Sequence, residues 1–244
     1  TALTMAGCSI ESEDVKTITV GISPDYAPYE SENKKGDIVG FDPDMMKCFE
    51  EYLSDEEGVT YKLEMKKMDF DNIITQLQGD QIDVGISGFT YDSKRKVEWS
   101  DPYLGSSQVA VIPKDSDIAS TADLEGKSLV AQTGATGEAA AKEVKDAKVK
   151  RFKNASSAVM ELKNGGADAV LIDNIMAEIY CKQNSDLQYE SVPSTAEDTV
   201  FCIEKGNTDL VQITHEGRAK AKKSGVHDYL YQQHFVDMVE IREA

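Results

Sequence analysis

The sequence is poor in the residues that build metal centres. Its 244 residues include four cysteines, one tryptophan and three histidines, and His215, His227 and His234 all lie near the C-terminus. No Cys-x-x-Cys pair and no cysteine–histidine spacing typical of zinc sites is present. We therefore expect neither a metal nor any other cofactor.

Positive charge and long apolar runs are also scarce. Lys and Arg number 26 against 44 Asp and Glu, which gives a net charge of −18. Phosphate binding needs concentrated Lys and Arg, so a nucleic-acid partner is disfavoured. No apolar run approaches the roughly 20 residues that span a bilayer. With 40% hydrophobic residues, the composition is that of a globular protein with one large domain or two ordinary ones.

The cysteines do not form an obvious framework. Cys8 follows Ala6-Gly7, and small residues before a cysteine near the start of a chain are typical of bacterial lipoprotein signals. We predict lipidation at Cys8, with residues 1–15 as signal remnant and polar tether; the alternative is a chance triplet. The protein is then extracytoplasmic and anchored to the cell membrane by lipid. Cys48 is predicted to be a core residue, and the sequence leaves open whether Cys181 and Cys202 form a disulfide.

Short apolar strands alternate with amphipathic helices along the whole chain. In the first half, strands are predicted at 17–22, 59–63 and 83–86, and helices from about 42 to 53 and from 70 to 78. Asp42 is a suitable N-cap and Pro43 suits a first helical turn. Such alternation is typical of an α/β fold with mostly parallel strands.

A weak internal repeat relates the two halves. With an offset of 85 residues (168 − 83), Asp83 aligns with Asp168, and both copies read helix, polar turn, Asp and apolar strand. Gly88 then aligns with Asp173, just beyond a strand, where open α/β sheets bind ligands. The repeat favours two similar lobes, although any two helix–turn–strand units look alike.

Two further segments read as connections between the lobes. Residues 105–113 are a predicted strand that leaves the first lobe, and residues 198–203 are one that returns to it. We predict a discontinuous first lobe of residues 16–107 and 203–244 and a second lobe of residues 108–202. Two crossing strands form a hinge about which the lobes can close on a ligand.

The segment from Asp83 to Tyr103 contains the side chains that are most informative about ligand binding. Its Ser-Gly-Phe-Thr turn, residues 87–90, precedes Lys94-Arg95-Lys96. A basic run by itself is most often a solvated face. A hydroxyl from Thr90 and the guanidinium of Arg95 at one corner would instead suit a carboxylate, because Arg offers a planar fork of donors.

These motifs together resemble a known family. They are ITVGISPDYAPYE, GFDPDMMKCF, MDFDNIITQLQGDQIDVGISGFT, RKVEWSDPY and VAQTGATGE, in this order. From about Ile18 to Phe235 the chain is similar to the extracellular solute-binding proteins (family 3) of polar amino-acid ABC transporters. The resemblance implies a type II periplasmic-binding-protein-like fold with two lobes, each a mostly parallel sheet flanked by helices, and a two-stranded hinge. It also implies a monomer that closes on a free L-amino acid and delivers it to an ABC transporter permease.

The resemblance assigns the amino-acid backbone to residues of both lobes. Arg95, with Thr90 and backbone N–H groups of the turn around Ala135 and Thr136, would hold the α-carboxylate. Asp173 would hold the α-ammonium, although an Asp at that place is also a good helix N-cap. The Gly88 carbonyl and the Thr90 hydroxyl, in the turn that begins at Ser87, would also bind the α-ammonium. The family usually has Thr where this chain has Ala135.

The resemblance also indicates which residues surround the ligand side chain. Tyr26 and Phe70 would form aromatic walls. Phe89 is a weaker candidate, and the alternative for it is a place in the core. Gln132 would reach the ligand or satisfy its own loop. Ser23 stands where relatives often carry an acid, which weakens the case for a basic amino acid. The identity of the ligand stays open, with a neutral polar or modestly apolar amino acid favoured.

Two other functions use the same scaffold. Some relatives are dehydratases that act on carboxylated rings, and others are sensory modules. No extra acid stands beside the predicted grip, so we expect binding and not catalysis. The basic segment 215–223 is poor in apolar residues, which leaves its packing uncertain.

Overall fold

The computed structural model describes residues 15–57 and 60–237. The predicted lipidation at Cys8 and most of the tether, residues 1–14, therefore lie outside the described residues. Within the described part, no helix combines the length and apolar character needed to cross a membrane. Cys48, Cys181 and Cys202 are free thiols, so the disulfide left open above is not formed.

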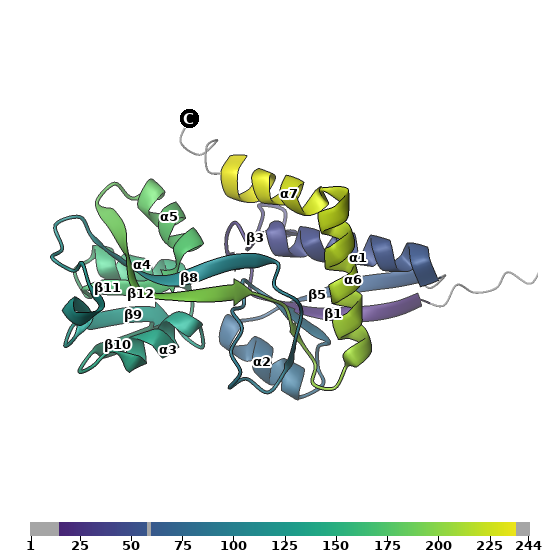
Figure 1. Cartoon of the computed structure of the whole chain (residues 1–244), viewed down its shortest axis with the longest axis horizontal. Helices are drawn as coiled ribbons and strands as arrows, with labels where there is room; N and C mark the ends of the chain where they lie inside the picture. The colour runs from purple at the N-terminus through teal and green to yellow at the C-terminus, as the bar shows by residue number, and fades with distance from the viewer. Residues whose placement is uncertain (1–14, 58–59, 238–244) are drawn as a thin grey trace, which may run out of the picture.

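Two five-stranded sheets divide the molecule into two lobes (Figure 1). The first sheet has the order β5 (Thr60–Lys67), β1 (Val15–Ile22), β6 (Val84–Ile86), β13 (Cys202–Ile203), β7 (Glu98–Trp99). The second has the order β10 (Lys148–Phe152), β9 (Ser128–Gln132), β11 (Ala169–Asp173), β8 (Leu104–Pro113), β12 (Leu187–Thr199). In both, the first three strands are parallel and the remaining pairings are antiparallel.

Helices cover both faces of each sheet, which confirms the predicted two-lobed α/β architecture (Figure 1). In the first lobe they are α1 (Phe41–Glu57), α2 (Phe70–Gln78), α6 (Thr208–Ser224), α7 (Val226–Tyr231) and the π-helical η2 (Gln232–Asp237). In the second lobe they are η1 (Thr121–Leu124), α3 (Thr136–Glu143), α4 (Ala155–Lys163) and α5 (Asn174–Gln183). A small sheet of β2 (Asp25–Tyr26), β3 (Glu30–Glu32) and β4 (Ile38–Val39) lies beside α1.

The internal repeat is present in three dimensions. Helices α2 and α4 and strands β6 and β11 hold equivalent positions in their lobes. The Asp83 carboxylate accepts a hydrogen bond from the Thr19 N–H at 2.7 Å, and Asp168 accepts one from the Ser128 N–H, also at 2.7 Å. Each aspartate thus fixes the start of its own strand against a neighbouring strand, so both binding loops that follow leave the sheets from equivalent places.

Strands β8 and β12 form the connection between the lobes. They pair in antiparallel fashion from Leu104 with Thr199 to Pro113 with Leu187, with an irregularity between Glu190 and Thr195. In Figure 1 they run side by side from one lobe to the other. The exact lobe boundaries at 107/108 and 202/203 stay a prediction.

The C-terminal helices pack closely on the first lobe. Gly217 of α6 is buried against Phe49 of α1, where even a methyl group would lie 2.5 Å from the ring. His227 contacts the Tyr103 carbonyl at 2.8 Å, and His234 contacts the Asp44 carboxylate at 2.8 Å. Within residues 215–223, the buried positions of α6 are held by the small residues Gly217 and Ala221.

Candidate ligand-binding site between the lobes

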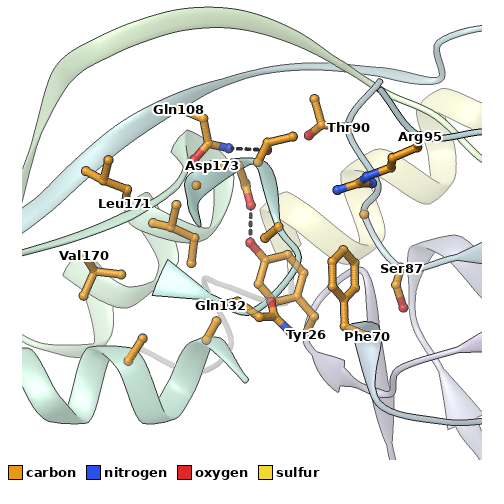
Figure 2. Close-up of a pocket in the computed structure, with 17 residues that line it drawn as sticks. Tyr26, Phe70, Ser87, Thr90, Arg95, Gln108, Gln132, Val170, Leu171 and Asp173 are labelled. Carbon is orange, nitrogen blue, oxygen red and sulfur yellow. Dashed lines mark hydrogen bonds between the residues drawn. The ribbon is translucent and has the colours of Figure 1, made fainter. Parts of the chain in front are cut away.

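A pocket lies between the lobes at the carboxyl ends of β6 and β11 (Figure 2). Ten of the eleven residues predicted to bind the ligand line it: Tyr26, Phe70, Ser87, Gly88, Thr90, Arg95, Gln132, Ala135, Thr136 and Asp173. The structure therefore brings residues of both lobes together around one space, at the edge where α/β sheets offer free strand ends.

Arg95 does not belong to a solvated basic run. Its side chain is only 12% exposed, whereas Lys94 and Lys96 on either side are exposed. One guanidinium nitrogen, Nη2, donates to the Gly134 carbonyl at 2.7 Å, and the group lies 5.3 Å from the centroid of the Phe89 ring. The other nitrogen, Nη1, is buried and has no hydrogen-bond partner among the described residues. A buried donor of this kind is suited to an anionic ligand group.

The turn opposite Arg95 leads into helix α3. Gly134 has a φ of +78°, a conformation that glycine adopts without strain. Ala135 occupies the N-cap, and its side chain makes no capping hydrogen bond. Alanine at this N-cap supplies no capping hydroxyl, and the helix N-terminus, which favours negative charge, lies at the pocket.

Asp173 ends β11 and caps helix α5. One of its carboxylate oxygens accepts the Met176 N–H at 3.0 Å, and the other accepts the Tyr26 hydroxyl (Figure 2). Burial raises the pKa of Asp173, and the Tyr26 and Met176 hydrogen bonds oppose that rise. The N-cap role and a place in the pocket therefore coexist, as the sequence allowed.

The lobes are in direct contact across the pocket. Besides the Arg95–Gly134 and Tyr26–Asp173 hydrogen bonds, Lys153 of the second lobe forms an ion pair with Asp69 of the first. The pocket measures only about 40 Å³, room for a few water molecules. The structure is thus a closed arrangement that must open to admit a ligand larger than these.

Ser87 and Gly88 hold the loop after β6 in place. The Ser87 hydroxyl accepts the Ser23 N–H at 2.9 Å, and the Gly88 N–H donates to the Asp42 carboxylate at 2.9 Å. Gly88 has a φ of +54° and lies against the rings of Tyr26 and Tyr29. A side chain at this position would be strained and would meet these rings.

Phe70 and Phe89 are stacked with ring centroids 4.5 Å apart, but only Phe70 lines the pocket. Phe89 is completely buried. Of the two predicted alternatives, the pocket wall and the core, the structure therefore places it in the core. The left-handed Gly88 reverses the chain, which turns the next side chain away from the pocket.

Two glutamines take different roles. The Gln132 side-chain amide donates to the Lys153 carbonyl at 3.0 Å, so it satisfies its own loop while it lines the pocket. Gln108, which sequence reasoning missed, is paired with Asp173 across β8 and β11 and is also at the pocket. A lone polar residue at the start of the apolar run Val109–Pro113 was the available signal.

The rest of the pocket wall is apolar and comes from the second lobe. It consists of Gly137, Ala155, Ala158, Val170, Leu171 and Ile172. The described residues contain no acidic or basic side chain in this wall, which suits the aliphatic part of a ligand.

Two buried carboxyl groups lie beneath the binding loop. Glu30 and Asp42 are both completely buried, and Asp42 accepts hydrogen bonds from the Gly88 N–H and, at 2.8 Å, from the Tyr103 hydroxyl. Burial raises the pKa of Asp42 to about 7. The pKa of Glu30 is raised well above its usual range by burial and by the charge of Asp42. The loop is therefore anchored on a pair of carboxyl groups that both keep their protons to a higher pH than exposed carboxyl groups do.

Known proteins with similar sequences and structures bind amino acids. The arginine-binding extracellular protein ArtP of Bacillus subtilis (strain 168) is 38% identical over 200 residues, which cover 79% of this chain and 75% of that protein. The structure of an ancestral arginine-binding protein bound to arginine has a TM-score of 0.80 and 37% identity, over 90% of this chain and 98% of the other. An ancestral amino-acid-binding protein, AncCDT-1, described as a precursor of cyclohexadienyl dehydratase, has a TM-score of 0.80 and 34% identity, over 90% and 95%.

The family model of the bacterial extracellular solute-binding proteins, family 3, matches residues 18–237. This match covers both sheets except the first three residues of β1, and it includes the connecting strands and every residue that lines the pocket. The chain therefore belongs to the bacterial extracellular solute-binding proteins, family 3.

Proposed function

We propose that the protein is the extracellular substrate-binding component of an ABC importer and closes its lobes on the zwitterionic backbone of a free amino acid. One observation carries the proposal: Arg95 of the first lobe and Asp173 of the second face the same pocket, and each is held in place by other contacts. A guanidinium and a carboxylate on opposite walls match the two charges of an amino acid.

The position of each charge supports an assignment. The free Nη1 of Arg95 and the N-terminus of α3 would bind the α-carboxylate. Asp173 would bind the α-ammonium in place of the Tyr26 hydroxyl. Each charge-assisted hydrogen bond contributes about 1.5–3 kcal/mol, so three or four are enough for a micromolar complex, about −8.2 kcal/mol, after ordering costs.

The remaining parts of the proposal concern where the protein works. Lipid on Cys8 would hold it at the outer face of the membrane, and the closed lobes would present the ligand to a permease. The protein would act as a monomer, as its resemblance to the family implies.

A thermal-shift screen of the twenty common amino acids tests the proposal. A ligand that binds only the folded protein stabilises it by an amount that grows with the logarithm of the ratio of ligand concentration to Kd, and so raises its melting temperature. We expect at least one amino acid to do so, and its carboxamide and its N-acetyl derivative to do so far less. Equal shifts with either derivative would contradict the zwitterion model. Recovery of the ligand unchanged after incubation separates binding from a dehydratase activity.

A further inference from the structure

Glu197 lies on β12, outside the residues that line the pocket, and reaches three side chains that do line it. It pairs with Ser106 of β8, which stands two residues before Gln108. Side chains two apart on a strand share a face, so Glu197 and Gln108 lie on the same face of the connecting strands. The Glu197 Oε2 atom accepts the Gln108 amide at 3.0 Å, the Thr90 hydroxyl at 3.2 Å and the Thr136 hydroxyl at 3.3 Å.

These contacts determine how the two threonines meet a ligand. A hydroxyl has a single hydrogen to donate and two lone pairs that accept. Because Thr90 and Thr136 give their hydrogens to Glu197, each hydroxyl offers only lone pairs to the pocket. Both threonines line that pocket, one from each lobe, so both act there as acceptors.

Gln108 also donates its hydrogens to Glu197 and Thr136 and leaves an acceptor atom. Its Nε2 atom donates to Glu197. The same atom donates to the Thr136 hydroxyl at 3.1 Å, the bond that is dashed at Gln108 in Figure 2. Its Oε1 atom is left buried with no hydrogen-bond partner among the described residues. Three lining residues thus present acceptors, and Asp173 adds a carboxylate to them.

The distribution of charge around the pocket also favours a ligand without a second carboxylate. Among the described residues, the charged side chains of the lining itself are Arg95 and Asp173. Three carboxyl groups adjoin the lining: Glu197 and Asp42 accept hydrogen bonds from lining residues, and Asp92 lies 3.9 Å from Arg95. The negative charge of Glu197 is felt across the pocket, because it helps to raise the pKa of Asp173. A zwitterion balances Arg95 and Asp173 and leaves the charge of Glu197 uncompensated.

We propose that Glu197 is a specificity-determining positioning residue of this site, which orients Thr90, Thr136 and Gln108 as acceptors and disfavours ligands that carry a second carboxylate. The proposal rests on the amino-acid-binding function proposed above. It assigns to the site a substrate class with a neutral or cationic side chain that bears N–H donors.

The test compares wild type with Glu197→Gln, which keeps the size of the side chain but removes its charge and supplies a donor. Glu190→Gln, on the same strand and without a contact to the pocket lining, is the matched control. Titration calorimetry measures Kd for two pairs of probes that differ by one charge, L-glutamine with L-glutamate and L-arginine with L-citrulline.

In Glu197→Gln we expect the affinity of the less positive member to rise relative to its pair by about tenfold, the order expected for one charge several ångströms away in a partly screened site. We expect Glu190→Gln to keep the wild-type ratios. Equal changes for both members of a pair would show a merely structural role and overturn the proposal, as would unchanged ratios. Wild-type binding of other amino acids but of none of these four overturns the specificity proposal alone. Binding of no amino acid at all overturns the proposed function.

Discussion

The Arg95 guanidinium of the first lobe donates a hydrogen bond to the Gly134 carbonyl of the second at 2.7 Å. The same group stacks over Phe89 and leaves Nη1 buried and unpaired within the described residues. One side chain therefore joins the lobes and still has a donor directed at the space between them.

We expect Arg95→Lys to lower the affinity for the amino acid found in the screen by tenfold to a hundredfold. Lysine is a point charge and cannot bond Gly134 and a carboxylate with separate nitrogens of one planar group; the loss of one charge-assisted hydrogen bond costs about 1.5–3 kcal/mol. Calorimetric titration measures the effect. Lys96→Ala, which removes an exposed charge from the same segment, should bind as wild type does, and retention of wild-type affinity in Arg95→Lys would remove Arg95 from the grip.

We expect Tyr26→Phe to destabilise the ligand-free protein by about 1–3 kcal/mol, because it leaves a buried oxygen of Asp173 without its donor. An ammonium group from the ligand would restore a donor, so the ligand should raise the melting temperature of the variant more than that of the wild type. Thermal unfolding with and without ligand measures both effects. A smaller ligand-induced shift in the variant would show that the hydroxyl assists binding instead of giving way to the ligand.

We expect the stability that Glu30 and Asp42 contribute to fall as pH rises from about 4 to beyond 7. Burial raises the folded-state pKa of Asp42 to about 7 and raises the pKa of Glu30 well above its usual range. The unfolded chain releases these two protons near pH 4 while the folded chain retains them, so the contribution of the pair is full below pH 4 and is lost as pH passes through the raised values. Glu30→Gln, which cannot ionise at this position, should therefore lose less stability than the wild type between pH 5 and pH 8. Urea unfolding at both pH values measures the difference. The control is Glu32→Gln on the same strand, and parallel pH profiles for wild type and Glu30→Gln would contradict the prediction.

We expect Asp83→Ala and Asp168→Ala to cost similar amounts, about 1 kcal/mol each, since both carboxylates accept a strand N–H in equivalent places. The conservative changes to Asn keep an acceptor oxygen and should cost less. Urea unfolding followed by circular dichroism measures the four variants. A loss of stability at only one of the two positions would show that the two aspartates are equivalent in position but not in their contribution to stability.

Much of this architecture could be predicted from the sequence because its signals are local or repeated. The alternation of strands and helices and the 85-residue offset (168 − 83) led to both binding loops. Phe89 was ambiguous because its direction depends on the left-handed Gly88 before it. The sequence contains no sign of that conformation beyond the glycine itself.

Gln108 and Glu197 were missed for a different reason. Each is a single polar residue on a strand, and such residues are usually explained by exposure on one face of the strand. Their role depends on the pairing of β8 with β12, whose positions lie about ninety residues apart in the chain. No local pattern in the sequence specifies that register.

The order of the strands has a consequence for synthesis of the protein. All strands of the second sheet precede residue 200, whereas the first sheet receives β13 and the helices α6 and α7 only after that point. During translation the inserted lobe can therefore complete its core while the lobe that begins the chain still waits for its last strand. Pulse proteolysis of ribosome-bound chains should find residues 108–190 protected before residues 15–100. Protection of the early segment first would contradict this order of maturation.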